Sequence, residues 1–450
     1  MSSSSEVTSP QAANSPAVNS QVLTFEDARH LVEQHAAVVA PRDSETLDLL
    51  TAYGRVLAEE IKADRDFPPF DRAARDGYAV RAADVTNLPV RLQLVGELKA
   101  GDWPDPRSCR VERNQAIGIM TGAPLPSGAD AVVMVEHTVL IDASVEVHRS
   151  VTAGENFVPR ASEARAGQLL LARGQPLHHA AIAIAASVGK QHVQVFRKPR
   201  VAVLSTGDEV VDIDATPGPA QIRNSNSYSL AVQIQNAGGE AVRLAIAPDE
   251  RTRLKSQIEA GLQYDLLLLT GGVSMGKYDL VEQVLAELNA EFYFTGAKIQ
   301  PGRPVVFGSC SSNCGAGVPA RVSAANPPSA HLEAFAEQKK YFFGLPGNPV
   351  STMVTFELFA RPMIEALSGA KPQPLIFVSA RLKAEVRAKT GLKRFLPAIL
   401  SGEFENAEVE LVHWQGSGDI ATLARANCYL VVPPDRERID PGEWVSLLMR

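Results

Sequence analysis

Three short apolar runs in the second half of the chain each end in a turn of glycine, hydroxyl or acidic residues. The runs are Val201–Leu204, Asp265–Leu269 and Tyr341–Gly344, each too short for a helix and suited to a buried parallel strand. A glycine turn between a strand and a helix presents backbone N–H groups to an anion, because no Cβ blocks the approach. Since the carboxyl ends of parallel strands meet at one sheet edge, we expect the three turns to form one site for a phosphate or another anion.

The turns supply the first candidate residues. Gly271 and Gly272 follow the second run, and Pro346-Gly347-Asn348 follows the third. Asp279 opens the helical pattern after the second turn, and a carboxylate there repels an anion unless a divalent cation lies between them. Asp279 also suits a helix N-cap, and Asp249, which precedes another helical pattern, has the same alternative.

The remaining elements are predicted from periodicity. The sequence favours a helix over Phe25–Val39, a continuing helix or turn over Glu45–Ile61, and a small all-β unit over Arg91–Val151. Gly167–Lys190 is typical of a turn followed by an Ala/Ile-rich helix. Lys371–Arg450 is rich in short strands, which suits a small barrel or sandwich.

Composition limits the class of protein. A chain of 450 residues exceeds one hydrophobic core and predicts two to four domains. With 45% apolar and 21% charged residues it is typical of soluble globular proteins, and no apolar run approaches the roughly 18 residues of a transmembrane helix. The net charge of −7 argues against nucleic acid or an anionic membrane as the main partner.

Two segments differ from this pattern. Residues 1–21 are rich in Ser, Pro and Asn without an apolar centre or basic start, which predicts a disordered tail and no signal peptide. Residues 309–340 have almost no periodicity, which predicts a mobile, dispensable insertion. Four cysteines in the whole chain suit a reducing cytoplasm, and the lone Cys310/Cys314 pair lacks the further ligands that zinc needs.

Six motifs carry a family resemblance. TGGVSMGKYD, STGDEV, GLPGNPVS and IQPGRP resemble the molybdenum-cofactor-binding (MoCF) fold shared by molybdopterin adenylyltransferases and molybdopterin molybdenumtransferases. FDRAARDGYAVRAAD (Phe70–Asp84) and IGIMTGAPLPSGADAVVMVE (Ile117–Glu136) resemble segments that only the molybdenumtransferases carry. Because the match runs from about Phe25 to the C-terminus, the chain resembles the MoeA family, to which the gephyrin E domain also belongs.

The resemblance implies a multi-domain α/β plus β fold. It consists of a central doubly wound MoCF domain, an N-terminal β-rich domain, a linking helical and β segment, and a C-terminal small β barrel. The expected ranges are a tail at 1–21, a linking region at 22–64 and 167–198, the β-rich domain with DGYA and MTGAP at 65–166, the MoCF domain at 199–370, and the C-terminal β domain at 371–450.

The resemblance also implies an activity. Adenylylated molybdopterin and molybdate are the expected substrates, and molybdenum cofactor and AMP the products. The enzyme would be a cytoplasmic homodimer in which DGYA reaches across from a second subunit, with an adenylyltransferase and molybdoenzymes as further partners. The negative charge of the phosphoanhydride must be neutralised as AMP leaves, so Mg²⁺ is the expected cofactor.

Site residues are carried over by motif position. The implied catalytic residues are Asp76, Thr121, Glu209 and Asp279. The implied Mg²⁺ ligands are Glu209, Asp249 and Asp279. The implied substrate-binding residues are Glu163, Gly271, Gly272, Ser274, Lys298, Arg303, Pro346, Asn348, Arg394 and Ser417. Each carboxylate also has a purely structural interpretation, as a turn residue, helix cap or first-turn charge.

Two departures from the family pattern concern anion binding. Gln300 and Arg303 stand where members with KPGKP place lysines, so Lys298 is the only lysine nearby. Arg303 retains one charge with a fork geometry. In residues 156–167, Glu163 stands near the position where family members carry an Asp. Val158 occupies the position of an expected Arg, and Arg160 or Arg165 could compensate for the loss of that Arg.

Two other functions remain open from sequence. A nucleotidyl-transferring or hydrolysing relative could keep the MoCF fold, but Phe70–Asp84 and the C-terminal domain argue against it. A non-catalytic scaffold, as the relation to gephyrin suggests, would lack the acidic set, which is intact here. The recipient molybdoenzymes and the choice between molybdate and tungstate are not encoded in any motif.

Overall fold

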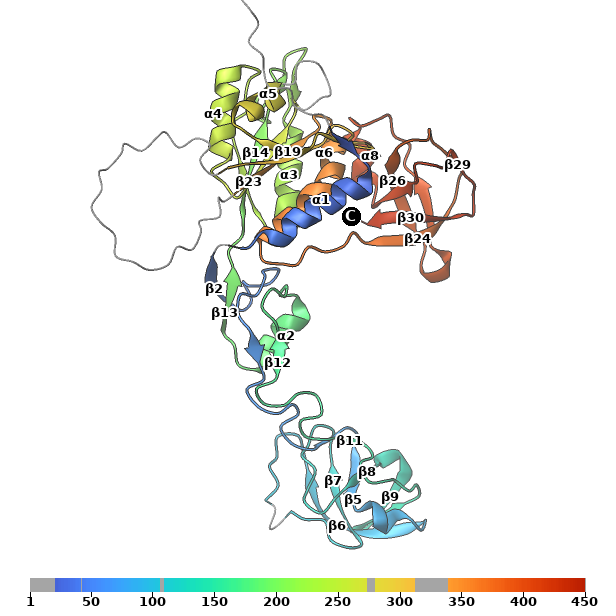
Figure 1. The fold of residues 1–450 in the computed structure, drawn as a ribbon. Coiled ribbons are helices and arrows are strands. Elements are labelled where there is room, and N and C mark those ends of the chain that lie inside the picture. Colours follow the sequence, from blue (N-terminus) through green and yellow to red (C-terminus); the bar gives the residue numbers. More distant parts are fainter. Residues whose placement is uncertain (1–20, 42, 106–108, 273–279, 312–338, 450) are drawn as a thin grey trace, which may run out of the picture. The chain divides into compact units, whose positions relative to one another are not determined.

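The computed structural model describes residues 21–41, 43–105, 109–272, 280–311 and 339–449 (Figure 1). The chain divides into two compact units. The first contains Met1–Glu45, Gly54–Val56 and Val195–Arg450, and the second contains Thr46–Tyr53 and Leu57–Gln194. Among the described residues no helix is long and apolar enough to cross a membrane.

A six-stranded sheet forms the centre of the first unit. Its order is β17-β14-β18-β23-β22-β19; the first four strands are parallel, and β22 runs antiparallel to both of its neighbours, β23 and β19. The strands are β14 (Arg200–Ser205), β17 (Glu240–Arg243), β18 (Leu266–Thr270), β19 (Glu291–Phe294), β22 (Val306–Cys310) and β23 (Lys340–Leu345). The three predicted strand runs are confirmed as neighbours, with β18 in the middle.

The uninterrupted apolar runs arise because helices cover both faces of this sheet. Side chains alternate along a strand, so Val201 and Val203 pack on one face while Ala202 and Leu204 pack on the other. The first face is covered by α3 (Ser225–Asn236) and α6 (Pro349–Thr355), and the second by α4 (Arg251–Gly261) and α5 (Leu280–Glu287). The doubly wound MoCF-type domain is therefore confirmed.

The helix after β23 is longer than the sequence pattern indicates. The sequence after Pro346-Gly347-Asn348-Pro349 predicts a helix over Val350–Ala360, but the helix continues through a π-helical turn, η3 (Phe356–Ala360), into α7 (Arg361–Leu367). Pro362 has no N–H to donate to the Leu358 carbonyl four residues earlier. The buried Arg29 of α1 (Phe25–Val38) donates to that carbonyl instead, at 2.7 Å. A long-range contact thus satisfies the carbonyl.

The C-terminal region of the first unit is a closed barrel of five strands, as predicted (Figure 1). Each strand is hydrogen-bonded to two others, in the cyclic order β26-β27-β24-β30-β28. The strands are β24 (Phe377–Leu382), β26 (Lys393–Ser401), β27 (Glu408–Leu411), β28 (Cys428–Val432) and β30 (Trp444–Met449). Phe395 and Tyr429 of the barrel share a core with α1 and the central sheet.

Short elements complete the first unit. These are β1 (Val22–Leu23) paired with β20 (Gly296–Ala297), β15 (Val210–Val211) with β16 (Ile222–Arg223), β21 (Ile299–Gln300) beside β26, β25 (Val386–Arg387) with β29 (Arg438–Ile439), η4 (Phe404–Asn406) and α8 (Ile420–Arg425).

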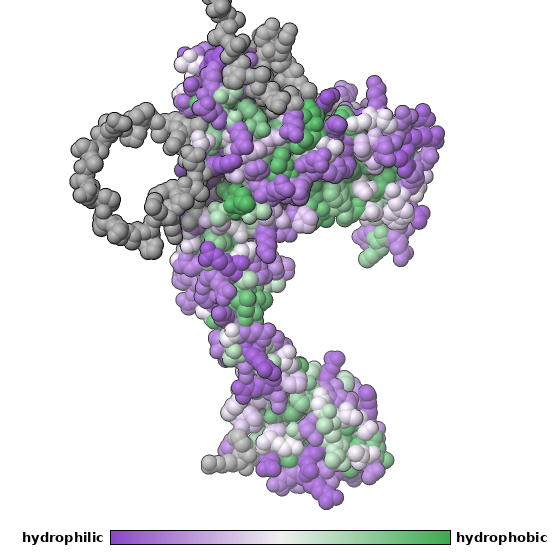
Figure 2. All heavy atoms as spheres, in the orientation of Figure 1, coloured by the Kyte–Doolittle hydropathy of each residue, from purple (hydrophilic) through white to green (hydrophobic). Residues whose placement is uncertain are grey.

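A six-stranded sheet dominates the second unit and confirms the predicted all-β region. Its order is β8-β5-β7-β6-β10-β9, with β6 and β7 parallel. The strands are β5 (Gly77–Val80), β6 (Val90–Leu98), β7 (Gln115–Ile119), β8 (Ala131–Met134), β9 (Thr138–Ile141) and β10 (Ser144–Val147). Exposed apolar side chains include Val135, Val139 and Leu140, and green patches appear on this unit in Figure 2.

The rest of this part of the chain forms smaller elements. They are β3 (Ile61–Lys62) with β12 (Leu169–Leu171), β4 (Arg72–Ala73) with β11 (Phe157–Val158), α2 (His179–Ser187), η1 (Ala82–Val85), η2 (Val135–His137), and the pair β2 (Ser44–Asp48) and β13 (His192–Phe196). Glu45–Ile61, expected to continue as helix or turn, contains no helix, and residues 49–54 lie in turns. Ser44–Asp48 alternates exposed and half-buried residues, which is the strand period.

The predicted insertion connects two adjacent antiparallel strands. Cys310 of β22 pairs with Lys340 of β23, so the ends of the segment are held side by side. Residues 312–338 lie outside the described residues, and the predicted mobility of this segment stays a prediction. Cys314 also falls there.

His35 of α1 makes an aromatic contact whose stability depends on pH. Its ring stacks on Tyr293 with centroids 4.0 Å apart, and its Nδ1 lies 3.3 Å from the Tyr341 hydroxyl. Burial, and then the positive charge of Lys339, lower the pKa of His35 below 6.5, against a smaller opposing effect of Glu291. The neutral ring is therefore favoured in the folded protein.

We expect the protein to lose stability as the pH falls through the range below 6.5. In that range the unfolded chain binds more protons at His35 than the folded chain does, and above it the contribution is fully present. The His35→Gln variant keeps a polar group near Tyr341 but cannot titrate. Its melting temperature should fall less than that of wild type between about pH 7.5 and 5.5. An equal fall in both proteins would contradict this assignment.

Candidate active site

The turns after β14, β18 and β23 line one pocket of about 340 Å³, as the sequence predicts. Its lining residues are Ser205, Thr206, Glu209, Val210, Ile222, Arg223, Asn224, Ser225, Asn226, Thr270, Gly271, Gly272, Pro304, Pro346, Gly347, Asn348 and Pro349. Gly271 has a φ of +92°, and a Cβ there would lie 2.5 Å from the Thr206 carbonyl oxygen. Only glycine fits so close to the neighbouring turn. Ser274 and Asp279 lie outside the described residues.

Asparagine side chains hold the pocket wall in place. Asn226 Nδ2 donates to the Thr270 hydroxyl at 2.9 Å and to the Gly347 carbonyl at 2.7 Å. Asn224 caps helix α3 by accepting from the Ser227 N–H, and it also accepts from the Ser205 hydroxyl. These bonds join the start of α3 to all three strand ends.

Acidic groups gather at one side of this pocket. Glu209 lines it, and Asp249 accepts no cap bond, because Glu250 is the N-cap of α4. The capping alternative for Asp249 is therefore wrong. Burial, and then repulsion from Asp208 and Glu209, raise the pKa of Asp249 above its ordinary value. A cluster whose negative charges repel one another favours a bound cation, and its oxygen donors suit Mg²⁺.

This acidic group is incomplete as a metal centre in the part of the chain that the structure describes. No three His, Cys, Asp or Glu side chains there are grouped closely enough to hold a metal ion. Since Asp279 falls outside that part, the predicted set of Glu209, Asp249 and Asp279 stays a prediction.

The turn after β23 contacts Ser417, one of the two C-terminal candidate residues. Asn348 Nδ2 donates to the Ser417 hydroxyl at 2.8 Å, and the Val350 N–H donates to the Ser417 carbonyl. Ser417 also lines a separate shallow pocket with His413 and Arg425. The structure thus brings Ser417 beside the pocket residue Asn348, and Pro346 lines the same wall.

The basic candidates do not line the main pocket. Lys298 and Arg303 are exposed, although Pro304, next to Arg303, is a lining residue. Gln300 pairs with Arg394 in the β21–β26 ladder. Arg394 donates to the Lys389 carbonyl, and its buried Nε has no partner among the described residues.

Several polar lining residues were not predicted as site residues from the sequence. Thr206, Arg223, Asn224 and Asn226 all face the pocket, and Arg223 supplies its only cationic side chain within the described lining. The signal was present in the segment QIRNSNSY, where two asparagines flank the start of a helix. The hydrophobic pattern of this segment predicts only a helix, Tyr228–Gln235, and no site residue.

The second unit holds a separate group of predicted residues. Asp76 accepts a hydrogen bond from the Thr121 N–H at 2.6 Å, and bonds from Thr121 lower the pKa of Asp76. Asp76 precedes β5, where a Cβ on Gly77 would lie 1.9 Å from the Val133 carbonyl oxygen. Asp76 also lines an open apolar cleft with Tyr78 and other residues of the sheet. Asp76 and Thr121, 45 residues apart, are therefore neighbours.

Glu163 lies in the same unit but is engaged elsewhere. It forms an exposed ion pair with Arg72 at 3.2 Å. Arg160, one proposed substitute for the missing family arginine, pairs with Asp66 at 2.7 Å and lowers the pKa of that carboxyl together with a backbone bond from Ala166.

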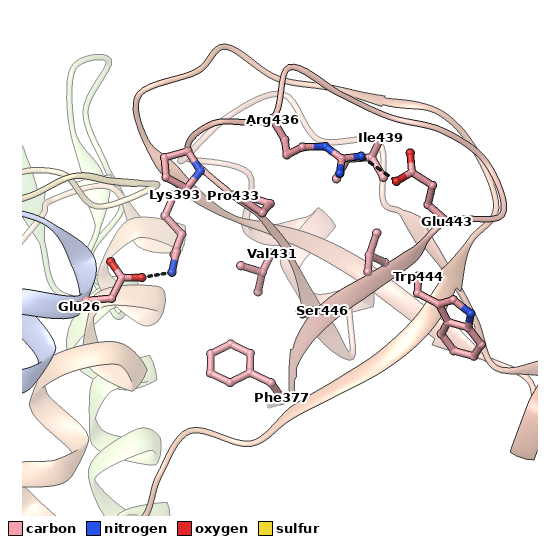
Figure 3. A pocket seen from close by; sticks show the side chains of 12 residues that line it. Glu26, Phe377, Lys393, Val431, Pro433, Arg436, Ile439, Glu443, Trp444 and Ser446 are labelled. Carbon is pink, nitrogen blue, oxygen red and sulfur yellow. Dashed lines mark hydrogen bonds and ion pairs between the residues drawn. The ribbon is translucent and has the colours of Figure 1, made fainter.

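Another pocket, of about 360 Å³, lies between the start of α1 and the barrel (Figure 3). Figure 3 shows the Glu26–Lys393 ion pair on one side and the Arg436–Glu443 pair on another. No predicted site residue is among its described lining residues.

Comparison with known proteins agrees with this architecture. The α/β unit with a glycine-lined pocket at its strand ends defines a molybdopterin-binding class of domain, and residues 202–366 match the family model described as a probable molybdopterin binding domain. Residues 23–189 match the MoeA N-terminal region (domain I and II), and residues 379–449 match the MoeA C-terminal region (domain IV). The chain belongs to the MoeA family.

Individual relatives extend over nearly the whole chain. The chain is 34% identical to a molybdopterin molybdenumtransferase of Nostoc sp. over 90% of its length and 89% of the relative's. It is 32% identical to a molybdopterin molybdenumtransferase of Synechocystis sp., over 88% of its length and 93% of the relative's. A crystal structure of the molybdopterin biosynthesis MoeA protein of Pyrococcus horikoshii superposes with a TM-score of 0.73 at 27% identity, covering 96% of this chain and all of that one (100%).

Proposed function

We propose that the protein is a molybdopterin molybdenumtransferase, which inserts molybdenum from molybdate into adenylylated molybdopterin and releases AMP in molybdenum cofactor biosynthesis. The observation that carries the proposal is the pocket at the ends of β14, β18 and β23, in a chain related over about nine-tenths of its length to enzymes of that name. The described residues supply polar contacts and carboxylates for binding and orientation, which is what this reaction requires.

Each group in the pocket has a role in this proposal. The N–H groups of Gly271 and Gly272 bind a phosphate oxygen at the end of β18. Glu209 and Asp249 would hold Mg²⁺, which neutralises charge on the phosphates while AMP leaves. Asn348 and Ser417 hold the opposite wall. Lys298 and Arg303 are exposed cations near Pro304 and are the proposed source of attraction for molybdate.

We also propose that the enzyme is a homodimer whose reaction needs both groups of residues, Asp76 and Thr121 from one subunit and the Glu209 pocket from the other. The family resemblance supports this arrangement. We further propose a cytoplasmic location, supported by the free thiols of Cys109 and Cys428, and exchange of substrate and product with an adenylyltransferase and recipient molybdoenzymes.

Mixing two inactive variants tests the dimer. Asp76→Ala and Glu209→Ala subunits should each be inactive alone. After random exchange, half of the dimers are mixed and each mixed dimer keeps one intact site of two, so about a quarter of wild-type AMP release should return. Mixed dimers without activity would exclude a shared site.

Release of AMP tests the reaction itself. Purified protein with adenylylated molybdopterin, Mg²⁺ and molybdate should release AMP, and omission of molybdate should prevent it. Release that does not depend on molybdate would favour a hydrolase instead.

A further inference from the structure

Two polar atoms of the pocket lack hydrogen-bond partners in the described part of the chain. They are Oδ1 of Asn226 and Oγ1 of Thr206, and both atoms are buried. Thr206 as a whole is only 2% exposed. Leaving such a group unpaired costs about 1–3 kcal/mol, so a buried polar atom without a protein partner indicates a partner supplied by something else. Since both residues line the pocket, that partner is a ligand.

The orientation of Asn226 decides what kind of ligand group this is. Its Nδ2 donates to the Gly347 carbonyl at 2.7 Å, and a carbonyl can only accept. The side-chain amide therefore cannot be flipped, and Oδ1 is the atom left without a partner. An amide oxygen accepts but never donates. The ligand group that meets Asn226 is a hydrogen-bond donor.

Thr206 lies against the glycine turn. A Cβ on Gly272 would be 2.9 Å from Thr206 Oγ1, so this buried hydroxyl lies directly against the turn. A hydroxyl can donate or accept, so it complements either a ring nitrogen or an N–H group. The anion-binding turn and the free acceptor of Asn226 thus lie in one pocket but suit different parts of a ligand.

Most of the substrate cannot provide that donor. Phosphate oxygens, molybdate and dithiolene sulfur are acceptors, whereas the pterin ring carries an amino group and ring N–H donors. We propose that Asn226 and Thr206 recognise the N–H edge of the pterin and so select the heterocycle. This inference rests on the proposed function, because it assumes that the ligand carries a pterin. The adenosine amino and ribose hydroxyl groups are the other donors, and the experiment separates them.

Binding of neopterin, a free pterin without phosphate or dithiolene, tests the assignment by fluorescence quenching of the full-length protein. Thr206→Val keeps the shape of the side chain and removes only the hydroxyl, and Asn226→Ala removes the acceptor. Each change should weaken neopterin binding about tenfold and leave AMP binding unchanged, because a site built around a hydrogen bond discriminates strongly when the bond is lost.

A control variant separates recognition from structure. Asn236→Ala changes the far end of the same helix and lies outside the pocket lining. It should bind neopterin within about twofold of wild type. Wild type should also bind a 2-dimethylamino pterin more weakly than neopterin, whereas Asn226→Ala should bind the two pterins with equal affinity. This comparison has the form of a double-mutant cycle.

The outcomes are distinguishable from a failure of the proposed function. Unchanged neopterin binding in Asn226→Ala and Thr206→Val would overturn the inference while AMP release by wild type still supported the enzyme. Weakened AMP binding with unchanged neopterin binding would assign the donor to the adenosine and would also overturn the inference. If wild type released no AMP but neopterin binding were weakened in the two variants, the proposed function would fail and the assignment of Asn226 and Thr206 to the pterin would stand.

Discussion

Replacing Glu209 with Gln should lower AMP release by about a hundredfold or more without destabilising the protein. The change removes a charge that an oxygen-bound divalent cation requires, and losses of this size follow removal of one group that stabilises developing charge. Because repulsion from Glu209 contributes to the raised pKa of Asp249, removal of the Glu209 charge also removes this repulsion from the folded protein. The melting temperature at neutral pH should therefore stay the same or rise.

The pH dependence has a defined sign. Burial, and then repulsion from Asp208 and Glu209, raise the pKa of Asp249, so the folded protein holds this proton more tightly than the unfolded chain does. The charged Asp249 therefore reduces stability as the pH rises above 3.8, and this loss is fully present at neutral pH. Glu209→Gln should reduce that loss. The matched control is Glu259→Gln on helix α4, outside the pocket, which should alter neither activity nor this profile.

Magnesium titration completes this test. Higher Mg²⁺ should restore part of the activity of Glu209→Gln, since a weakened site fills at a higher concentration of ion. Full activity of Glu209→Gln at low Mg²⁺ would remove Glu209 from the metal site and leave it as a surface charge.

Replacing Gly77 with Ala should destabilise the second unit and abolish most activity. The new Cβ would lie 1.9 Å from the Val133 carbonyl oxygen, so β5 and β8 cannot keep their pairing. Overpacking of this kind costs about 1–3 kcal/mol. Asp76 precedes Gly77 and accepts from Thr121, so the same shift displaces the Asp76 carboxylate.

Thermal melts and AMP release measured on the same samples check this expectation. Gly96→Ala is the matched control, because Gly96 lies in the same sheet and a Cβ there would meet no atom within 4 Å. Its melting temperature should match that of wild type. A stable and active Gly77→Ala protein would show that the contact between β5 and β8 is not required.

The sequence was sufficient wherever a local pattern determined the structure. Val201–Leu204 and Leu266–Leu269 are apolar at every position, so each strand had to be buried on both faces. Parallel strands place their carboxyl ends together, so one pocket followed from three turns. The candidate residues Asp76 and Thr121 came from the family resemblance, through their positions in the DGYA and MTGAP motifs.

Local patterns misled where a distant residue decided the outcome. The helix after Asn348 continues beyond Ala360 because Arg29 takes over the carbonyl that Pro362 leaves unpaired. Glu250 caps α4 because its carboxylate reaches the Thr252 and Arg253 N–H groups, although Asp249 is the better capping residue by type.

Only the tertiary structure showed which side chains meet. Asn226 and Gly347 are 121 residues apart, and Asn348 and Ser417 are 69 apart, yet both pairs are hydrogen-bonded. Hydrophobic periodicity records the face that each element buries and contains no information about polar partners on other elements. The amino-acid sequence by itself therefore determined the class of fold, the family and the anion-binding turns. The packing of α3 against the strand ends decided that Asn226 presents an acceptor to the pocket, because its donors are held by groups that lie far away along the chain.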